Sequence, residues 1–271
     1  MTDLSRFALN QATVRAWSLR QAIEGCARHG VKRIGVWRDK LAECGLGEAR
    51  RLLRDHGLTV TGLNRAGPFF GVGTELKPST ADDDRRAIAE AAEIGAECLL
   101  VFPGVDRRVG DLARSRALTA ERIGSLLPEA RRAGVTLAIE PLHPMLAGDR
   151  SPFNSLRQAN ILCDELGSGL GIVLDAYHSW WDSDLDRQIP RAGSRLLGFH
   201  ICDWLAPTRD LYQDRGMMGD GVIDLAGLRQ SLDAAGYAGS IEVEIFSARD
   251  WWTRDPDEVV RIAIERYLRL L

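Results

Sequence analysis

Seven glycines divide this chain into alternating helical and extended stretches. Each glycine closes a segment whose apolar residues recur near the helical period, and each precedes a short apolar run. Glycine just past a helix end adopts the left-handed backbone conformation that ends the last turn, so the repeated pattern predicts a helix followed by a strand. The seven are Gly30, Gly57, Gly95, Gly134, Gly167, Gly193 and Gly236.

The repeated helix–glycine–strand pattern predicts eight strands, each followed by a helix. Eight such units indicate an α/β protein, a single (β/α)8 TIM barrel, in which residues 1–271 form one domain. A barrel of this type needs roughly 250 residues, and the chain has 271. The predicted strands are Arg6–Asn10, Arg33–Trp37, Thr59–Asn64, Cys98–Phe102, Val135–Glu140, Gly171–Asp175, Leu196–His200 and Ser240–Phe246.

Several helix starts carry capping signals. Ser18 with Gln21 and Asp255 with Glu258 match the capping-box pattern. Proline at the first helical position predicts further starts after Ser151 and after Asp255. The last helix, over residues 257–271, is expected to close the ring of helices.

Composition excludes several classes of protein. The chain is 45% hydrophobic and 27% charged, with a formal net charge of −3 and no long basic run, so we expect no nucleic-acid partner. No apolar run approaches the roughly 20 residues that cross a bilayer, and no targeting segment is evident, so we expect a cytoplasmic enzyme without a membrane partner. The five scattered cysteines are typical of reduced, packed thiols.

Strand parity selects the side chains that meet inside the barrel. In Val135–Glu140 the branched apolar residues alternate with the set that includes Glu140, and the apolar set is expected to face the helices. The same parity turns Asp175, His200 and Glu244 inward. Applied to the first four strands, it brings four more side chains to the C-terminal mouth, where barrel enzymes place their sites: Asn10, Trp37, Asn64 and Phe102.

Three inward carboxylates repel one another, and an unpaired buried charge costs several kcal/mol, so a compensating cation is expected. The oxygen-rich set Glu140, Asp175, His200 and Glu244 favours one divalent metal ion, with Mn²⁺ the first choice and Mg²⁺, Co²⁺ or Zn²⁺ as alternatives. Ordinary salt bridges are the competing interpretation. Glu242 is the rival to Glu244 as a ligand; we expect it one layer below the metal, paired to a basic residue.

Six stretches in this order give the chain an end-to-end resemblance to the xylose isomerase-like sugar isomerase/epimerase superfamily, which includes inosose isomerases, ketose 3-epimerases and hydroxypyruvate isomerases. The resemblance implies that Glu140, Asp175, His200 and Glu244 bind a single metal, and that Glu140 and Glu244 are also the acid/base pair. It implies substrate contacts for His178 and Arg215. The stretches are Leu9-Asn10-Gln11-Ala12-Thr13, Ile139-Glu140-Pro141, Leu174-Asp175-Ala176-Tyr177-His178, Phe199-His200-Ile201-Cys202-Asp203, Gly219-Asp220-Gly221-Val222-Ile223-Asp224 and Val243-Glu244-Ile245-Phe246.

The implied activity is a metal-dependent isomerase or epimerase of a keto-sugar or cyclitol that works through an enediolate. A lyase on the same site, a dehydratase or a 3-keto-glycoside-cleaving enzyme, is the main alternative, and a non-catalytic sugar-binding barrel is the third. His143 is either an extra acid or base or a loop histidine bonded to the backbone. Phosphorylation of the substrate, a homo-oligomer and a second subunit are left open.

Apurinic endonucleases share the barrel but use extra histidines for a three-metal cluster. Here the first four predicted strands end without histidine, and Asp214-Arg215-Gly216 stands where a D-x-H pair is expected. The sequence therefore argues against nuclease activity.

Overall fold

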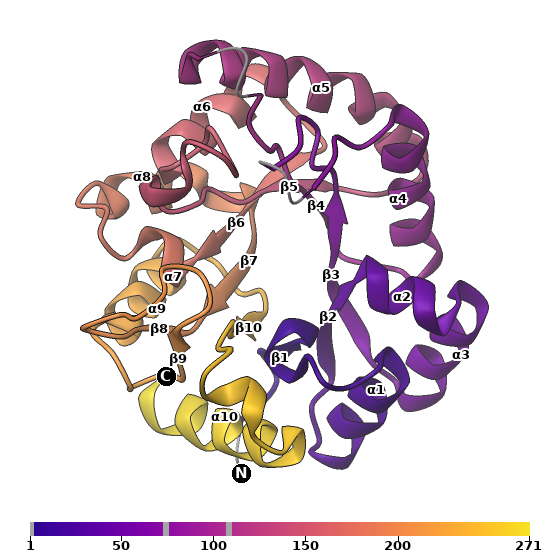
Figure 1. Ribbon diagram of the computed structural model, residues 1–271, viewed down its shortest axis with the longest axis vertical. Coiled ribbons are helices and arrows are strands. Elements are labelled where there is room, and N and C mark those ends of the chain that lie inside the picture. Colours follow the sequence, from indigo (N-terminus) through magenta and orange to yellow (C-terminus); the bar gives the residue numbers. More distant parts are fainter. Residues whose placement is uncertain (1–2, 73–75, 107–109) are drawn as a thin grey trace.

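The computed structural model describes residues 3–72, 76–106 and 110–271. Within these residues, eight parallel strands close a barrel in the order β1-β10-β7-β6-β5-β4-β3-β2, with helices around it (Figure 1). The (β/α)8 prediction is confirmed. The barrel strands are β1 (Phe7–Asn10), β2 (Arg33–Trp37), β3 (Thr59–Ala66), β4 (Leu99–Val101), β5 (Leu137–Ile139), β6 (Leu170–Asp175), β7 (Leu196–Ile201) and β10 (Ile241–Val243).

The helices form the outer layer. The last of them covers β1, where the ring of Tyr267 meets that of Phe7 edge-on at 5.1 Å, so the end of the chain closes the ring as predicted. No helix of the described segments is long and apolar enough to cross a membrane. The helices are α1 (Leu19–Arg28), α2 (Arg38–Cys44), α3 (Leu46–His56), α4 (Ala81–Glu93), α5 (Leu112–Arg132), α6 (Leu156–Leu166), α7 (Ala176–Ser179), α8 (Leu185–Ala192), α9 (Leu225–Ala234) and α10 (Pro256–Leu270).

The helix ends follow the glycine pattern, and one predicted start is wrong. All seven punctuating glycines have positive φ; Gly57, for example, caps α3 with φ 64° and ψ 41°. The capping box of Ser18 at α1 is present. The start predicted after Ser151 is wrong, because α6 begins at Leu156 with Ser155 as its cap, and the Ser151 hydroxyl instead accepts from the Phe153 backbone N–H.

The core has two layers, as strand parity predicts. Outward strand residues pack with the helices in one large cluster that includes Leu137, Ile139 and Ile172. A separate, smaller cluster fills the barrel interior, formed by Cys98, Leu100, Ala138 and Val173. Apolar side chains thus occupy the interior below the mouth, and the candidate functional side chains lie at the C-terminal ends of the strands.

Candidate metal centre

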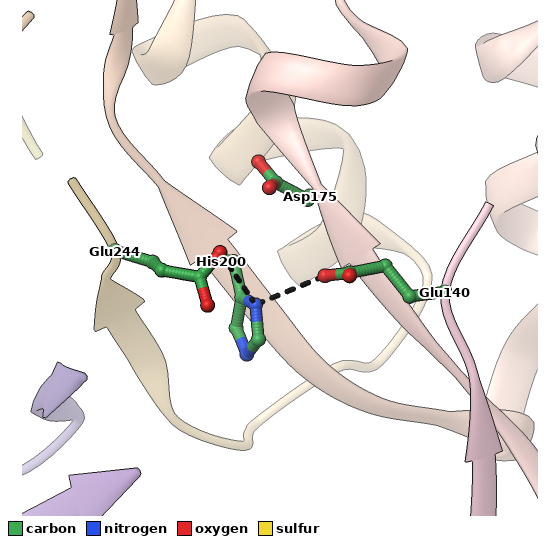
Figure 2. Close-up of side chains that lie close together, drawn as sticks. All are labelled: Glu140, Asp175, His200 and Glu244. Atoms are coloured by element: carbon green, nitrogen blue, oxygen red, sulfur yellow. Dashed lines mark ion pairs between the residues drawn. The ribbon is translucent and has the colours of Figure 1, made fainter. Parts of the chain in front are cut away.

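Four side chains predicted as metal ligands meet at the mouth of the barrel (Figure 2). Glu140 is the first residue after β5, Asp175 ends β6, His200 lies near the end of β7, and Glu244 is the first residue after β10. These strands are consecutive around the barrel, which explains why residues so far apart in sequence become neighbours.

The donor atoms of this cluster fit a divalent metal. Each residue offers one ligand atom, and these atoms all lie within 4.8 Å of one another. His200 Nδ1 lies 3.1 Å from Glu140 Oε1 and 3.8 Å from Glu244 Oε2. The 3.1 Å contact lacks hydrogen-bond geometry, so Glu140 Oε1 and His200 Nδ1 stay buried without a hydrogen-bond partner in the described parts of the chain. Buried polar atoms need partners, and carboxylates with imidazole bind divalent cations.

Arg215 places a fixed positive charge beside the cluster. It lies in β9 (Arg215–Gly216), which pairs with β8 (Asp203–Trp204) in a short antiparallel ribbon that follows β7. Its Nη1 donates to Asp175 Oδ2 at 3.0 Å and to Glu244 Oε2 at 3.3 Å. A metal is therefore not the sole cation that balances the three carboxylates, which corrects the sequence argument on this point.

Protons supply the rest of the charge balance in the metal-free protein. Burial raises the pKa of Glu244 to about 8. Burial alone would lower the pKa of His200, but the carboxylates of Glu242, Glu244 and Glu140 outweigh it and raise that pKa to about 10. At neutral pH the cluster therefore holds protons on Glu244 and His200 that a metal must displace.

Metal affinity is accordingly expected to rise with pH. Both protons are bound below pH 8, so the apparent Kd for Mn²⁺ should weaken by at least about tenfold for each unit from pH 8 down to pH 6. Titration calorimetry in two buffers of different ionisation enthalpy measures the affinity and the protons released. Affinity that is flat across this range, without proton release, would show that the cluster is not the binding site.

Glu242 lies one layer below the cluster, as expected, and the basic residue that it faces is His200. Its carboxylate accepts from Asn10 Nδ2 at 2.5 Å and from the Thr61 hydroxyl, and no lysine or arginine of the described residues pairs with it. Its Oε1 lies 3.6 Å from His200 Nε2, the nitrogen opposite the one that faces the cluster. Glu242 is thus placed to orient the imidazole rather than to join the ligand set.

A cavity opens directly above the cluster. Its walls include the predicted side chains of Trp37, Asn64 and Phe102, together with Glu140, His178, Arg215 and Glu244. The sequence did not predict the other lining residues, which include Arg65, Arg150, Tyr212 and Phe246. Arg65 was missed because β3 continues to Ala66 with a register shift after Asn64, so simple alternation fails there.

The amino-acid sequence matches the model of a known protein family. Residues 20–270 fit the xylose isomerase-like TIM barrel model. The chain belongs to this family. The matched range includes the positions of all four residues of the cluster.

Named members of the family are distant relatives of the chain. An inosose isomerase from Bacillus velezensis is 25% identical, over 96% of this chain and 95% of its own. An L-ribulose 3-epimerase from Mesorhizobium japonicum is 26% identical, over 79% and 67%. A 3-dehydroshikimate dehydratase from Pseudomonas putida is 24% identical over 74% of this chain, which spans 31% of that protein.

Solved structures agree on the barrel. A crystal structure of a protein from Sinorhizobium meliloti 1021 is 47% identical, covers 99% of both chains and superposes with a TM-score of 0.91. The crystal structure of the IOLI protein with a bound zinc atom is 21% identical, with a TM-score of 0.82 over 98% of this chain and 97% of that one. At that identity the second likeness concerns the fold.

His178 lies at the edge of the cluster of four candidate ligands. The backbone N–H of His143 donates to His178 Nδ1 at 3.2 Å, and burial together with Arg215 lowers the pKa of His178 well below its usual value. The ring is therefore neutral with its proton on Nε2, only 3.2 Å from Arg215 Nη2. Both side chains also lie near Asp175 Oδ2, which is 3.7 Å from His178 Nε2 and 3.0 Å from Arg215 Nη1.

Two other predicted site residues lie away from the cavity. Asn10 is fully buried. Its side-chain amide donates a hydrogen bond to the Glu242 carboxylate and accepts one from the indole N–H of Trp37 at 2.8 Å. His143 is outside the cavity lining; its ring stacks on Trp204 at 5.1 Å and its Nδ1 accepts from the Met145 backbone N–H. These contacts correspond to the loop-histidine interpretation of His143, while its catalytic role stays a prediction.

Proposed function

We propose that this chain is a divalent-metal-dependent isomerase or epimerase of a keto-sugar or cyclitol, and that Glu140 and Glu244 form its acid/base pair. The observation that carries the proposal is the placement of these two carboxylates, which reach the His200 ring from opposite sides of the mouth (Figure 2). A substrate held between them would expose opposite faces of one carbon to the two groups.

Each residue then has a distinct task. A divalent metal, when bound, would supply Lewis-acid stabilisation of the negative charge that develops on the substrate oxygens. Glu140 is the most exposed of the four ligands, at 18% of its side chain, and it would take the proton next to the carbonyl. Glu244 would return a proton from the other side, which gives an epimer, or to the neighbouring atom, which gives an isomer. His178 and Arg215 would donate to a substrate oxygen.

Mn²⁺ is the metal that we propose first. Three of the four ligands are carboxylates, which suit harder cations than thiolate sites do. The solved relative with a bound zinc atom keeps zinc as the alternative, with Mg²⁺ and Co²⁺ next. The cluster alone does not separate these ions, so each should be tested by reconstitution.

A lyase on the same cluster is the second candidate, favoured by the match to 3-dehydroshikimate dehydratases. Proton abstraction by Glu140 is common to both reactions, and the outcome depends on whether the substrate carries a leaving group at the β carbon. Product identity, rather than the site geometry, separates the two.

The test uses Mn²⁺-loaded protein in D₂O with three carbonyl substrates: an inosose, L-ribulose and 3-dehydroshikimate. The proposal predicts deuterium at the carbon next to the carbonyl, together with an epimer or isomer, and loss of both after chelation. An unsaturated product would identify the lyase. Metal-dependent binding of a substrate without any exchange would contradict catalysis and indicate a binding protein.

Glu242→Gln tests the positioning role of the buried carboxylate. Loss of an outer-shell partner of a ligating histidine costs about 10–100-fold in metal affinity, and we expect a Kd for Mn²⁺ weakened to that extent. Exchange should recover at saturating Mn²⁺, because the four ligands are intact. Unchanged affinity would refute the role, and loss that saturating metal does not restore would make Glu242 a ligand in place of Glu244.

A further inference from the structure

Arg65 is a cation in the wall of the cavity that the mechanism above does not use. It follows Asn64 at the irregular end of β3, and its guanidinium lies over two predicted pocket rings. The guanidinium carbon is 3.9 Å from the centre of the Phe102 ring and 5.5 Å from that of Trp37. Cation–π contact with these rings holds the side chain against the cavity wall.

Among the described residues, the Arg65 guanidinium has no ion-pair partner. Within residues 3–72, 76–106 and 110–271, no hydrogen bond or ion pair engages its side chain. Burial lowers the pKa of Arg65 and the like charge of Arg150 adds to this, although Glu140 and Glu244 oppose it from a distance. Those two carboxylates are committed to the cluster, so none of the described residues supplies Arg65 with a counterion.

Arg65 also stands where two cavities meet. The inner cavity above the cluster has a volume of about 40 Å³, and an outer cavity of about 600 Å³ adjoins it. Both are lined by Trp37, Arg65, Arg150, Tyr212 and Phe246. Because the two cavities share these residues, a substrate at the cluster that extends into the outer cavity would pass Arg65.

The other cations of the outer cavity differ from Arg65. Lys40 is paired with Glu43 at 3.3 Å. Arg15 is exposed and lies 4.8 Å from the centre of the Trp252 ring, away from the inner cavity. Arg150 lies 4.2 Å from the centre of the Tyr212 ring and faces both cavities. Among these cations, Arg65 is the one at the junction that we take as the anion-binding group.

We propose that the substrate carries an anionic oxygen group, a carboxylate or a phosphate, that binds Arg65 at this junction while its carbonyl end reaches the cluster. The inference rests on the proposed function only for the position of the carbonyl end. Arg recognises both groups through paired N–H donors, and such charge-assisted bonds are roughly twice as strong as neutral ones.

The test compares three probes by titration calorimetry on Mn²⁺-loaded protein: D-fructose, 5-keto-D-gluconate and D-fructose 6-phosphate. At least one anionic probe is expected to bind tenfold or more tightly than D-fructose, and the better of the two identifies carboxylate or phosphate. Arg65→Gln should weaken that probe at least tenfold and leave D-fructose within twofold. Arg65→Lys keeps the charge without the planar fork, so we expect at least a threefold loss for the anion alone.

Arg15→Gln is the matched control, because it removes the same charge from the rim without touching the inner cavity. It should leave all three affinities within twofold. The inference is overturned if neither anion binds more tightly than D-fructose, if Arg65→Gln weakens neutral and anionic probes alike, or if Arg15→Gln does as much. Anion binding through Arg65 without metal-dependent exchange would instead sink the proposed function alone.

Discussion

Asp175→Asn is expected to abolish useful binding of the divalent metal. The substitution replaces a charged ligand with a neutral amide at a fully buried position, so the loss in Mn²⁺ affinity should exceed the about 10–100-fold that an outer-shell change costs. Arg215 keeps its contact with Glu244, which preserves the position of the β8–β9 ribbon. Titration calorimetry with Mn²⁺ measures the effect, and substrate proton exchange should fall with it.

Asp164→Asn is the control for this prediction. Asp164 is an exposed carboxylate that pairs with Arg191 and Arg195 far from the mouth, so the same chemical change should leave metal affinity unaltered. If Asp175→Asn binds Mn²⁺ within threefold of the unmodified protein, the four-ligand assignment is wrong.

Glu140→Gln is expected to lower the rate of substrate proton exchange by about 10²–10⁴-fold, the range that a positioned acid or base contributes. The measurement is deuterium uptake by the substrate at saturating Mn²⁺, with metal occupancy checked in the same sample. This separates the role of Glu140 as a base from its role as a metal ligand. Glutamine keeps an oxygen donor for the metal but does not accept the proton.

Glu244→Gln tests the proposed return of a proton to the opposite face of the substrate carbon. If Glu244 returns the proton, its loss should block formation of the epimer while the starting substrate still exchanges through Glu140. Equal loss of exchange in both variants would contradict separate roles. Full exchange in Glu140→Gln would assign the base to another residue.

Strand parity accounts for what could be predicted from the sequence. Each ligand is the last inward residue of a strand bounded by glycine punctuation, so the alternation locates Glu140, Asp175, His200 and Glu244 without any knowledge of the loops. All four positions lie within one residue of an observed strand end. The interior cluster that contains Ala138 and Val173 confirms the same rule lower in the barrel.

The other features of the site depend on contacts between distant segments, which the alternation of side chains along one strand does not predict. Glu242 contacts Asn10 on the neighbouring strand β1 and Thr61 on β3, further around the barrel, so its partners follow from closure and register rather than from spacing. Arg215 reaches the cluster from the β8–β9 ribbon that follows β7. Arg65 enters the cavity through a local register shift that a period of two does not anticipate.

The most direct test of the account is the metal content of the purified protein, measured per chain by elemental mass spectrometry before and after reconstitution with Mn²⁺. The account predicts about one ion per chain, lost on chelation. A value near zero even after reconstitution would contradict the metal centre, and a value near three would point to the multi-metal chemistry that the sequence argues against.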